Sequence, residues 1–128
     1  MTSPTFSLGL DFGTNTARAL IADVRDGREI GSGVAPYPHG DAGILSDPRD
    51  PNVARQHPGD WAEAMEAAVK KALEAARADP RFEPRSIAGI GVDATASTPV
   101  PVDARCVPVV FQERFTRDLN AHAWLWKD

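Results

Sequence analysis

The chain of 128 residues has little that would direct it out of the cell or into a membrane. Its single cysteine, Cys106, cannot form an internal disulfide, which fits a reducing compartment. No apolar run approaches the roughly 20 residues that a membrane-spanning helix needs. The first residues also lack the basic segment and apolar core of a signal peptide. We therefore expect a soluble domain in the cytoplasm.

The chain also lacks an excess of basic residues. It has 14 Lys and Arg against 18 Asp and Glu, a formal net charge of −4 and a pI near 5.3. Nucleic acid is therefore not expected as the main partner, because phosphate binding needs a basic surface. The hydrophobic share of 42% is ordinary for a globular protein, and the length allows one domain and not two.

The first part of the chain predicts an antiparallel meander of three short strands. Apolar residues alternate along 6–12, and a second apolar run covers 16–24. Between them, Gly13-Thr14-Asn15 has the residue types of a tight turn, and Asp26-Gly27 is a hairpin signal. The third strand is expected from about Arg28 to Tyr37.

A loop, a helix and another strand are expected next. Residues 38–58 are rich in proline and glycine and predict a long loop, with a binding role and a simple insertion equally open. A helix should start at Pro58 and end before Pro80. Its expected core stripe comprises Trp61, Met65, Ala68, Val69, Ala72 and Ala76.

The stretch from Ile87 to Val92 is apolar on both faces, which predicts a central strand covered on two sides. Because a helix precedes it as a crossover, this strand could join the sheet in parallel. A short hairpin is expected from residues 99–102 and 106–110, around Asp103-Ala104-Arg105. The fold class is thus α/β, with a meander, a crossover helix and a parallel strand.

The segment from Asp11 to Arg18 is the first candidate site. It places a carboxylate at the end of a strand, followed by a turn with Gly13, Thr14 and Asn15 and then by a basic residue. Backbone N–H groups and hydroxyls of such a turn can bind phosphate oxygens, and the carboxylate can hold Mg²⁺ directly or through water. An ordinary hairpin turn remains the alternative.

The second candidate follows the last predicted strand, as Asp93-Ala94-Thr95-Ala96-Ser97-Thr98. In open sheets, ligands bind in the crevice beyond the carboxyl ends of parallel strands. Small and hydroxylated residues there would let a polyol approach and form hydrogen bonds. The alternative is an ordinary loop whose side chains bond to their own backbone.

Several ordered blocks of the chain resemble the FGGY carbohydrate kinases. These are GLDFGTNTARALIADVRDG, YPHG, ARQHPGDW, IAGIGVDATASTPVPVD and AHAWLWKD. The first block and GIGVD are shared broadly in that family. The ARQHP, DATASTPVPVD and LWKD blocks are narrower and are similar to those of L-ribulokinases.

The resemblance implies an actin-like, ribonuclease-H-like domain, with residues 1–128 forming the N-terminal portion of the first of two domains. It implies ATP and Mg²⁺ as cofactors and a pentulose as substrate, L-ribulose being converted to L-ribulose 5-phosphate in L-arabinose catabolism. Asp11 would help to hold Mg²⁺, with Gly13, Thr14, Asn15 and Arg18 around the phosphates. The residues implied to line the sugar pocket are Ala96, Ser97, Trp126, Lys127 and Asp128.

The resemblance also implies that catalysis needs parts that these residues do not contain. The general-base Asp and the adenosine-binding motif of the family have no counterpart in this sequence. We therefore expect a fragment that is inactive alone and prone to self-association through uncovered strand edges, and a homo-oligomer is possible. Alternatives are a kinase for another ketose such as D-ribulose or xylulose, a non-catalytic sugar-binding or regulatory module, and half of another actin-like ATPase.

Overall fold

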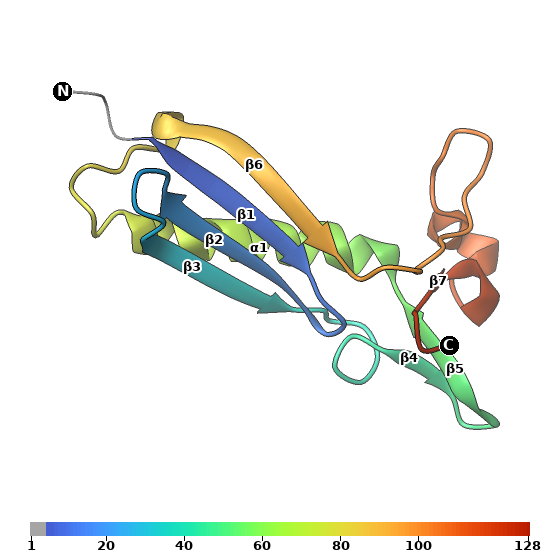
Figure 1. Cartoon of the computed structure of the whole chain (residues 1–128). Coiled ribbons are helices and arrows are strands. Elements are labelled where there is room, and N and C mark those ends of the chain that lie inside the picture. The colour runs from blue at the N-terminus through green and yellow to red at the C-terminus, as the bar shows by residue number, and fades with distance from the viewer. Residues whose placement is uncertain (1–4) are drawn as a thin grey trace.

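The computed structural model describes residues 5–128 and contains two sheets and one long helix (Figure 1). The larger sheet has the order β3-β2-β1-β6, with β1 (Phe6–Phe12), β2 (Thr16–Asp23), β3 (Glu29–Pro36) and β6 (Ile87–Ala94). β2 pairs antiparallel with both β1 and β3, whereas β6 pairs parallel with β1. The predicted meander and parallel strand are therefore confirmed.

The helix α1 (Pro58–Ala76) begins at the predicted proline and runs along one face of this sheet (Figure 1). His57 caps it, because its Nδ1 accepts a hydrogen bond of 3.1 Å from the N–H of Gly59. The helix ends at Ala76, before Pro80, as expected. Its fully buried apolar stripe is narrower than predicted and is made of alanines at a spacing of four: Ala64, Ala68, Ala72 and Ala76.

Two glycines of β3 explain why the stripe consists of alanines. A Cβ atom on Gly31 would lie 2.4 Å from the carbonyl oxygen of Ala72, and one on Gly33 would lie 2.2 Å from that of Ala68. The strand and helix backbones therefore approach each other closely, and the alanine side chains at this contact are no larger than methyl groups. The larger predicted core residues, Trp61 and Val69, pack at the margins of this contact and remain partly exposed.

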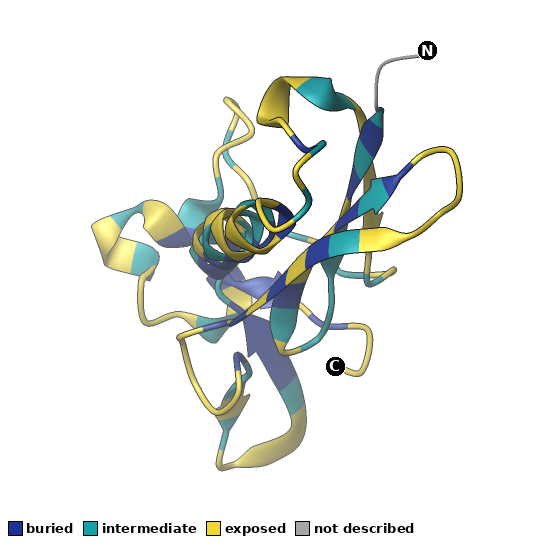
Figure 2. Cartoon of the chain, turned by 90° about the vertical axis from the view of Figure 1, so that its left-hand side faces the viewer, coloured by how far each residue is buried: buried dark blue, intermediate teal, exposed yellow. Residues whose placement is uncertain are grey.

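The core lies between α1 and the sheet, as the buried band in Figure 2 shows. Phe6 is fully buried on β1 and meets Phe82 edge to face, with ring centroids 5.3 Å apart. Leu8, Ala19 and Ile21 extend this core along β1 and β2. The alternation that predicted the strands thus correctly separates a helix-facing side from an open side.

The prediction of a plain loop over residues 38–58 is wrong. This stretch contains β4 (Leu45–Asp47) and β5 (Asp50–Gln56), which form a small sheet with β7 (Ala123–Trp124) in the order β4-β5-β7. The prolines misled the prediction because Pro48 lies in the turn of this hairpin. Asp47 closes that turn by accepting a hydrogen bond from the N–H of Arg49 (2.9 Å), and bonds to Arg49 lower the pKa of Asp47 to about 2.

The expectation that Ile87–Val92 would be covered on both faces is also wrong for the described residues. β6 is the edge strand of the sheet, and Ile90 and Val92 are 64% and 66% exposed. The sequence of this strand is apolar as described, but among residues 5–128 only Ile87 at its start packs against the core. The expected hairpin at 99–110 reduces to a turn closed by a single bridge between Val102 and Pro108.

Short 3-10 helices complete the chain. They span Pro84–Ser86, Val109–Phe111, Glu113–Phe115 and Leu119–Ala121. Within residues 5–128, none of the helices has both the length and the apolar character needed to cross a membrane.

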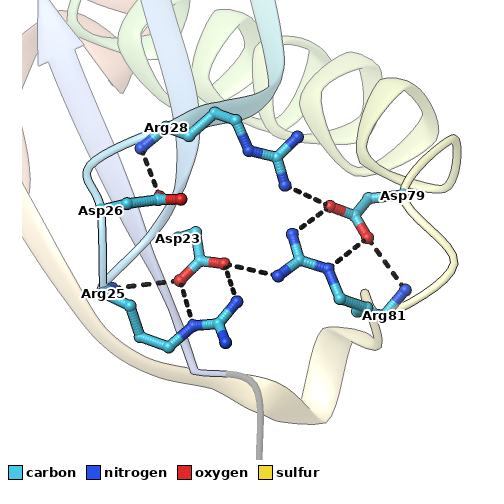
Figure 3. Close-up of polar contacts among 6 residues, drawn as sticks. All are labelled: Asp23, Arg25, Asp26, Arg28, Asp79 and Arg81. Carbon is cyan, nitrogen blue, oxygen red and sulfur yellow. Dashed lines mark hydrogen bonds and ion pairs between the residues drawn. The ribbon is translucent and has the colours of Figure 1, made fainter.

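An ion-pair network closes the end of the sheet that lies away from the carboxyl ends of β1 and β6 (Figure 3). The fully buried Asp23 contacts Arg25 (2.7 Å) and Arg81 (3.0 Å). Arg81 and Arg28 in turn contact Asp79, at 2.6 and 2.9 Å. Hydrogen bonds from Arg25, and then from Arg81, hold the pKa of Asp23 well below its usual range. The network joins the β2–β3 turn to the segment after α1.

Candidate functional site

The candidate site lies at the carboxyl ends of the two parallel strands β1 and β6. Beyond β1 comes the turn Gly13-Thr14-Asn15, and beyond β6 comes the loop of residues 95–98. The N–H of Thr95 donates to the carbonyl of Phe12 over 3.0 Å, so the two segments lie side by side. The two candidate motifs, which begin 82 positions apart in sequence (11 and 93), therefore meet at one edge of the sheet, as expected for a ligand site of an open sheet.

The turn after β1 is held by bonds on several sides. The N–H of Gly13 donates within the turn to the carbonyl of Thr16 (2.9 Å). The amide of Asn15 donates to the carbonyl of Ala42 (2.6 Å), so this side chain fixes the neighbouring loop. The hydroxyl of Thr14 accepts a long bond from an indole and keeps its own proton free for donation. Of these side chains, Thr14 is thus the one best placed to meet an anion.

Asp11, Arg18 and Asp93 lie together on the open face of the sheet. Nη2 of Arg18 is 2.7 Å from Oδ2 of Asp11, and Asp93 is the partner of Asp11 in the parallel register of β1 and β6. The three side chains line a cavity of about 580 Å³ with Leu20 and Val34. Two carboxylates beside each other, both reachable from solvent, are ligands that Mg²⁺ prefers, so the donor set fits a hydrated Mg²⁺ ion. Arg18 adds a cation suited to phosphate.

The residues predicted to contact sugar occupy an exposed loop. Ala96 and Ser97 are both exposed, and Ser97 adopts a left-handed backbone with φ of 56°. A second cavity of about 540 Å³ opens next to this loop, under Trp61 and Met65 of α1. Thr95 and Thr98 line it, whereas Ala96 and Ser97 do not.

The last residues return to the same edge of the sheet. Nε1 of Trp126 lies 3.5 Å from Oγ1 of Thr14, and the N–H of Trp124 donates to the carbonyl of Pro99 (3.0 Å). The structure therefore brings the predicted phosphate turn, the predicted sugar loop and Trp126 together. Lys127, the next residue along the chain, is exposed.

Asp128 is positioned differently from the other predicted sugar residues. Its carboxylate forms an ion pair with the buried Arg55 and accepts a hydrogen bond of 2.8 Å from the N–H of Ala54. Arg55 also stacks on Trp124, with its guanidinium carbon 4.1 Å from the ring centroid. In this arrangement Asp128 anchors the tail to β5.

Gln56 supports the site and was missed by the sequence reasoning. This fully buried side chain donates to the carbonyl of Thr14 over 2.7 Å, and its oxygen accepts from Nε1 of Trp61 at 3.3 Å. It thereby fixes the phosphate turn against the start of α1. The sequence predicts a loop for the stretch that contains Gln56, and one isolated glutamine there gives no signal of its role.

No protein-family model matches the chain. Its curated relatives are nevertheless consistent: it is 36% identical over 121 residues to a ribulokinase of Vibrio parahaemolyticus and 36% identical over 128 residues to one of Geobacillus thermodenitrificans. These alignments cover 94% and 95% of this chain but only 21% and 22% of the relatives. The chain thus spans about a fifth of the length of the curated relatives it matches.

Solved structures agree on the fold. A xyloylose kinase from Brucella ovis superposes with a TM-score of 0.69 at 26% identity, covering 96% of this chain and 21% of that one. A gluconate kinase from Lactobacillus acidophilus gives 0.70 at 14% identity, covering 98% and 20%. The fold is therefore that of the N-terminal part of actin-like sugar kinases. The structural neighbours are thus FGGY-type sugar kinases, and along its length the chain is similar to ribulokinases.

Proposed function

We propose that this chain supplies the phosphate- and sugar-facing part of an ATP-dependent pentulose kinase. The reaction would transfer the γ-phosphoryl group of ATP to a terminal hydroxyl of L-ribulose, as a cytoplasmic step of L-arabinose catabolism. The observation that carries the proposal is the hydrogen bond between Thr95 and Phe12, which joins the two motifs at one sheet edge. The similarity to ribulokinases over 94% of the chain supports the substrate class.

The open face of the sheet would serve the phosphates. Asp11, with Asp93 beside it, would hold Mg²⁺ through its water ligands, and the ion would neutralise charge on the transferred group. Thr14 would donate its hydroxyl proton to a phosphate oxygen, and Arg18 would exchange part of its contact with Asp11 for the phosphate. Gly13 leaves room for the guanidinium of Arg18 beside this turn, since a Cβ on Gly13 would lie 3.0 Å from Nη2 of Arg18.

The loop after β6 would serve the sugar. Ala96 leaves room for the carbon backbone of the ketose, and the hydroxyl of Ser97 can bond to a sugar hydroxyl. Trp126 would offer an apolar ring face near Thr14, and Lys127 lies exposed beside it. We assign Asp128 a supporting role through Arg55 rather than a direct contact with the sugar.

A chimeric enzyme tests this proposal. The matching N-terminal fifth of the Vibrio parahaemolyticus ribulokinase would be replaced by this chain, and ADP formation would be measured with L-ribulose, D-ribulose and D-xylulose. We expect activity that depends on Mg²⁺ and is highest with L-ribulose, whereas the 128-residue chain alone gives none. A folded chimera that prefers D-xylulose would favour the other-ketose alternative, to which the Brucella ovis structure also points. A folded chimera that binds sugar without turnover would favour a non-catalytic module.

A further inference from the structure

A cluster of histidine and carboxylate side chains stands apart from the phosphate and sugar motifs. The chain has only three histidines, and all three, His39, His57 and His122, line one cavity beside the start of α1. The rings of His39 and His57 are stacked, with centroids 4.2 Å apart and planes 18° apart. Asp60, in the first turn of α1, lies beneath them with 1% of its side chain exposed.

The carboxylate of Asp60 faces both stacked rings. Its Oδ1 lies 2.5 Å from Nδ1 of His39 and 3.6 Å from Nδ1 of His57. Its Oδ2 accepts a hydrogen bond of 3.1 Å from the backbone N–H of His39. A buried carboxylate needs a cation or several donors to offset its desolvation, and here every polar contact comes from a histidine.

We propose that His39, His57 and Asp60 form a binding site for a divalent ion of the zinc class. One ligand atom from each residue lies within 4.8 Å of the other two. Two imidazoles and one carboxylate are a common set for Zn²⁺, which binds nitrogen and oxygen at about 2.0–2.2 Å in tetrahedral geometry. Magnesium and calcium prefer ligand sets made of oxygen alone, so this site and the phosphate site would take different ions.

The spacing of the atoms suits this ion with two adjustments, one at each histidine. Two ligands on a tetrahedral zinc ion stand roughly 3.4 Å apart, close to the 3.6 Å between His57 and Asp60. The shorter contact of His39 is a hydrogen bond to Asp60, and this bond must open when both atoms bind the metal. The His39 ring then moves outward by about 1 Å, which it can do because half of it is exposed. At His57, the metal bond at Nδ1 replaces the bond from Gly59.

The site would leave a fourth position for water and would fasten two segments. His39 belongs to the loop after β3, whereas His57 and Asp60 form the cap and first turn of α1. Bound metal would therefore tie that loop to the start of the helix. The ligand His57 directly follows Gln56 in the chain. The backbone N–H of His39 donates to Oδ2 of Asp60 and would hold this carboxylate in position as a metal ligand.

Titration of the metal-free 128-residue protein with Zn²⁺, in competition with a chromophoric chelator, tests the proposal. We expect one ion per chain, a higher Tm with zinc, and no displacement by a large excess of Mg²⁺. His39→Ala should lower the zinc affinity at least tenfold. The variant keeps the backbone N–H of residue 39 that donates to Asp60, so it should still fold, with a lower Tm than the unmodified chain. His57→Asn should lose affinity similarly while keeping the helix cap, since asparagine is also a preferred capping residue.

His122→Asn is the matched control, because His122 lines the same cavity but is not among the three proposed ligands. We expect it to retain the zinc affinity of the unmodified chain. Equal affinity in the chain and in both ligand variants would overturn the proposal, as would the absence of saturable binding. An equal loss in His122→Asn would overturn the assignment of these three ligands. This test is independent of kinase activity, so it can fail while the proposed function stands.

Discussion

Arg18 and Asp11 face each other across the antiparallel pair β1 and β2, with Nη2 of the arginine 2.7 Å from Oδ2 of the carboxylate. The two side chains that the sequence assigned to phosphate and to Mg²⁺ therefore neutralise each other in the absence of ligand. Both are substantially exposed, and such surface pairs contribute only about 0–1 kcal/mol. Nucleotide and metal can thus separate the pair at little cost.

The first prediction concerns Asp11 in the chimeric kinase. Asp11→Asn should lower kcat strongly and change the KM for L-ribulose little, because the carboxylate acts on Mg²⁺ and phosphate and not on the sugar. Steady-state kinetics with each substrate varied in turn would measure this. The matched control is Asp26→Asn, which removes a carboxylate from the turn at the other end of β2 and should leave kcat unchanged. Near-normal kcat in Asp11→Asn would contradict the proposed Mg²⁺ role of Asp11 and would support the alternative of an ordinary hairpin turn.

The second prediction concerns the sugar loop. Ala96→Leu in the chimera would overfill a site sized for a pentulose, at a cost of ~1–3 kcal/mol. This corresponds to a roughly tenfold to hundredfold loss in kcat/KM for L-ribulose, with the KM for ATP nearly unchanged. The same kinetic measurements decide the outcome. Unaltered ketose kinetics would show that this loop does not line the sugar pocket.

The third prediction concerns acid stability. The pKa of Asp23 lies well below that of an unfolded aspartate, about 3.9. Its stabilising contribution is therefore complete above pH 4 and is lost as the pH falls further toward the folded pKa. Asp23→Asn should lower Tm at neutral pH and should flatten the decline of stability below pH 4, as followed by circular dichroism. The exposed Glu63→Gln is the control and should show the steep decline of the unmodified chain.

The fourth prediction concerns packing of the helix on the sheet. Gly33→Ala places a Cβ 2.2 Å from the carbonyl oxygen of Ala68, so backbone must shift, which costs about 1–3 kcal/mol. Gly89→Ala is the matched control on the edge strand, because a Cβ there meets nothing within 4 Å. Urea unfolding should show a loss for the first variant and little change for the second. Equal urea midpoints for the two variants would mean that the helix can shift at this contact with little loss of stability.

Local patterns predicted the larger sheet well. Alternation along β1, the Asp26-Gly27 turn and the proline at the start of α1 each specify one local structure, and each was found. The turn within Asp11–Arg18 also lies where the sequence predicts it, between β1 and β2, while its binding role stays a prediction. What one sequence could not supply was pairing over long distances. β5 meets β7 through Gln56 and Ala123, which no local pattern links.

The failures have a common physical cause. The exposure of β6 depends on what lies beside the sheet, which its own apolar composition does not reveal. The contacts of Asp128 with Arg55, and of Gln56 with Thr14, depend on tertiary placement of side chains. The histidine cluster was overlooked for the same reason, since His39 and His57 lie 18 positions apart in sequence and meet only after α1 docks.

The meeting of Gly31 and Gly33 with the alanines of α1 has a mechanical consequence. Where bulky side chains interlock, a helix can slide as rotamers readjust, but here backbone rests on backbone and no rotamer can change. The sheet and α1 are therefore expected to move as one body, so that the start of the helix at Asp60 keeps its position relative to Asp11 on β1 and to the turn at Thr14. For the proposed kinase, we therefore expect any hinge between open and closed forms to lie outside this unit.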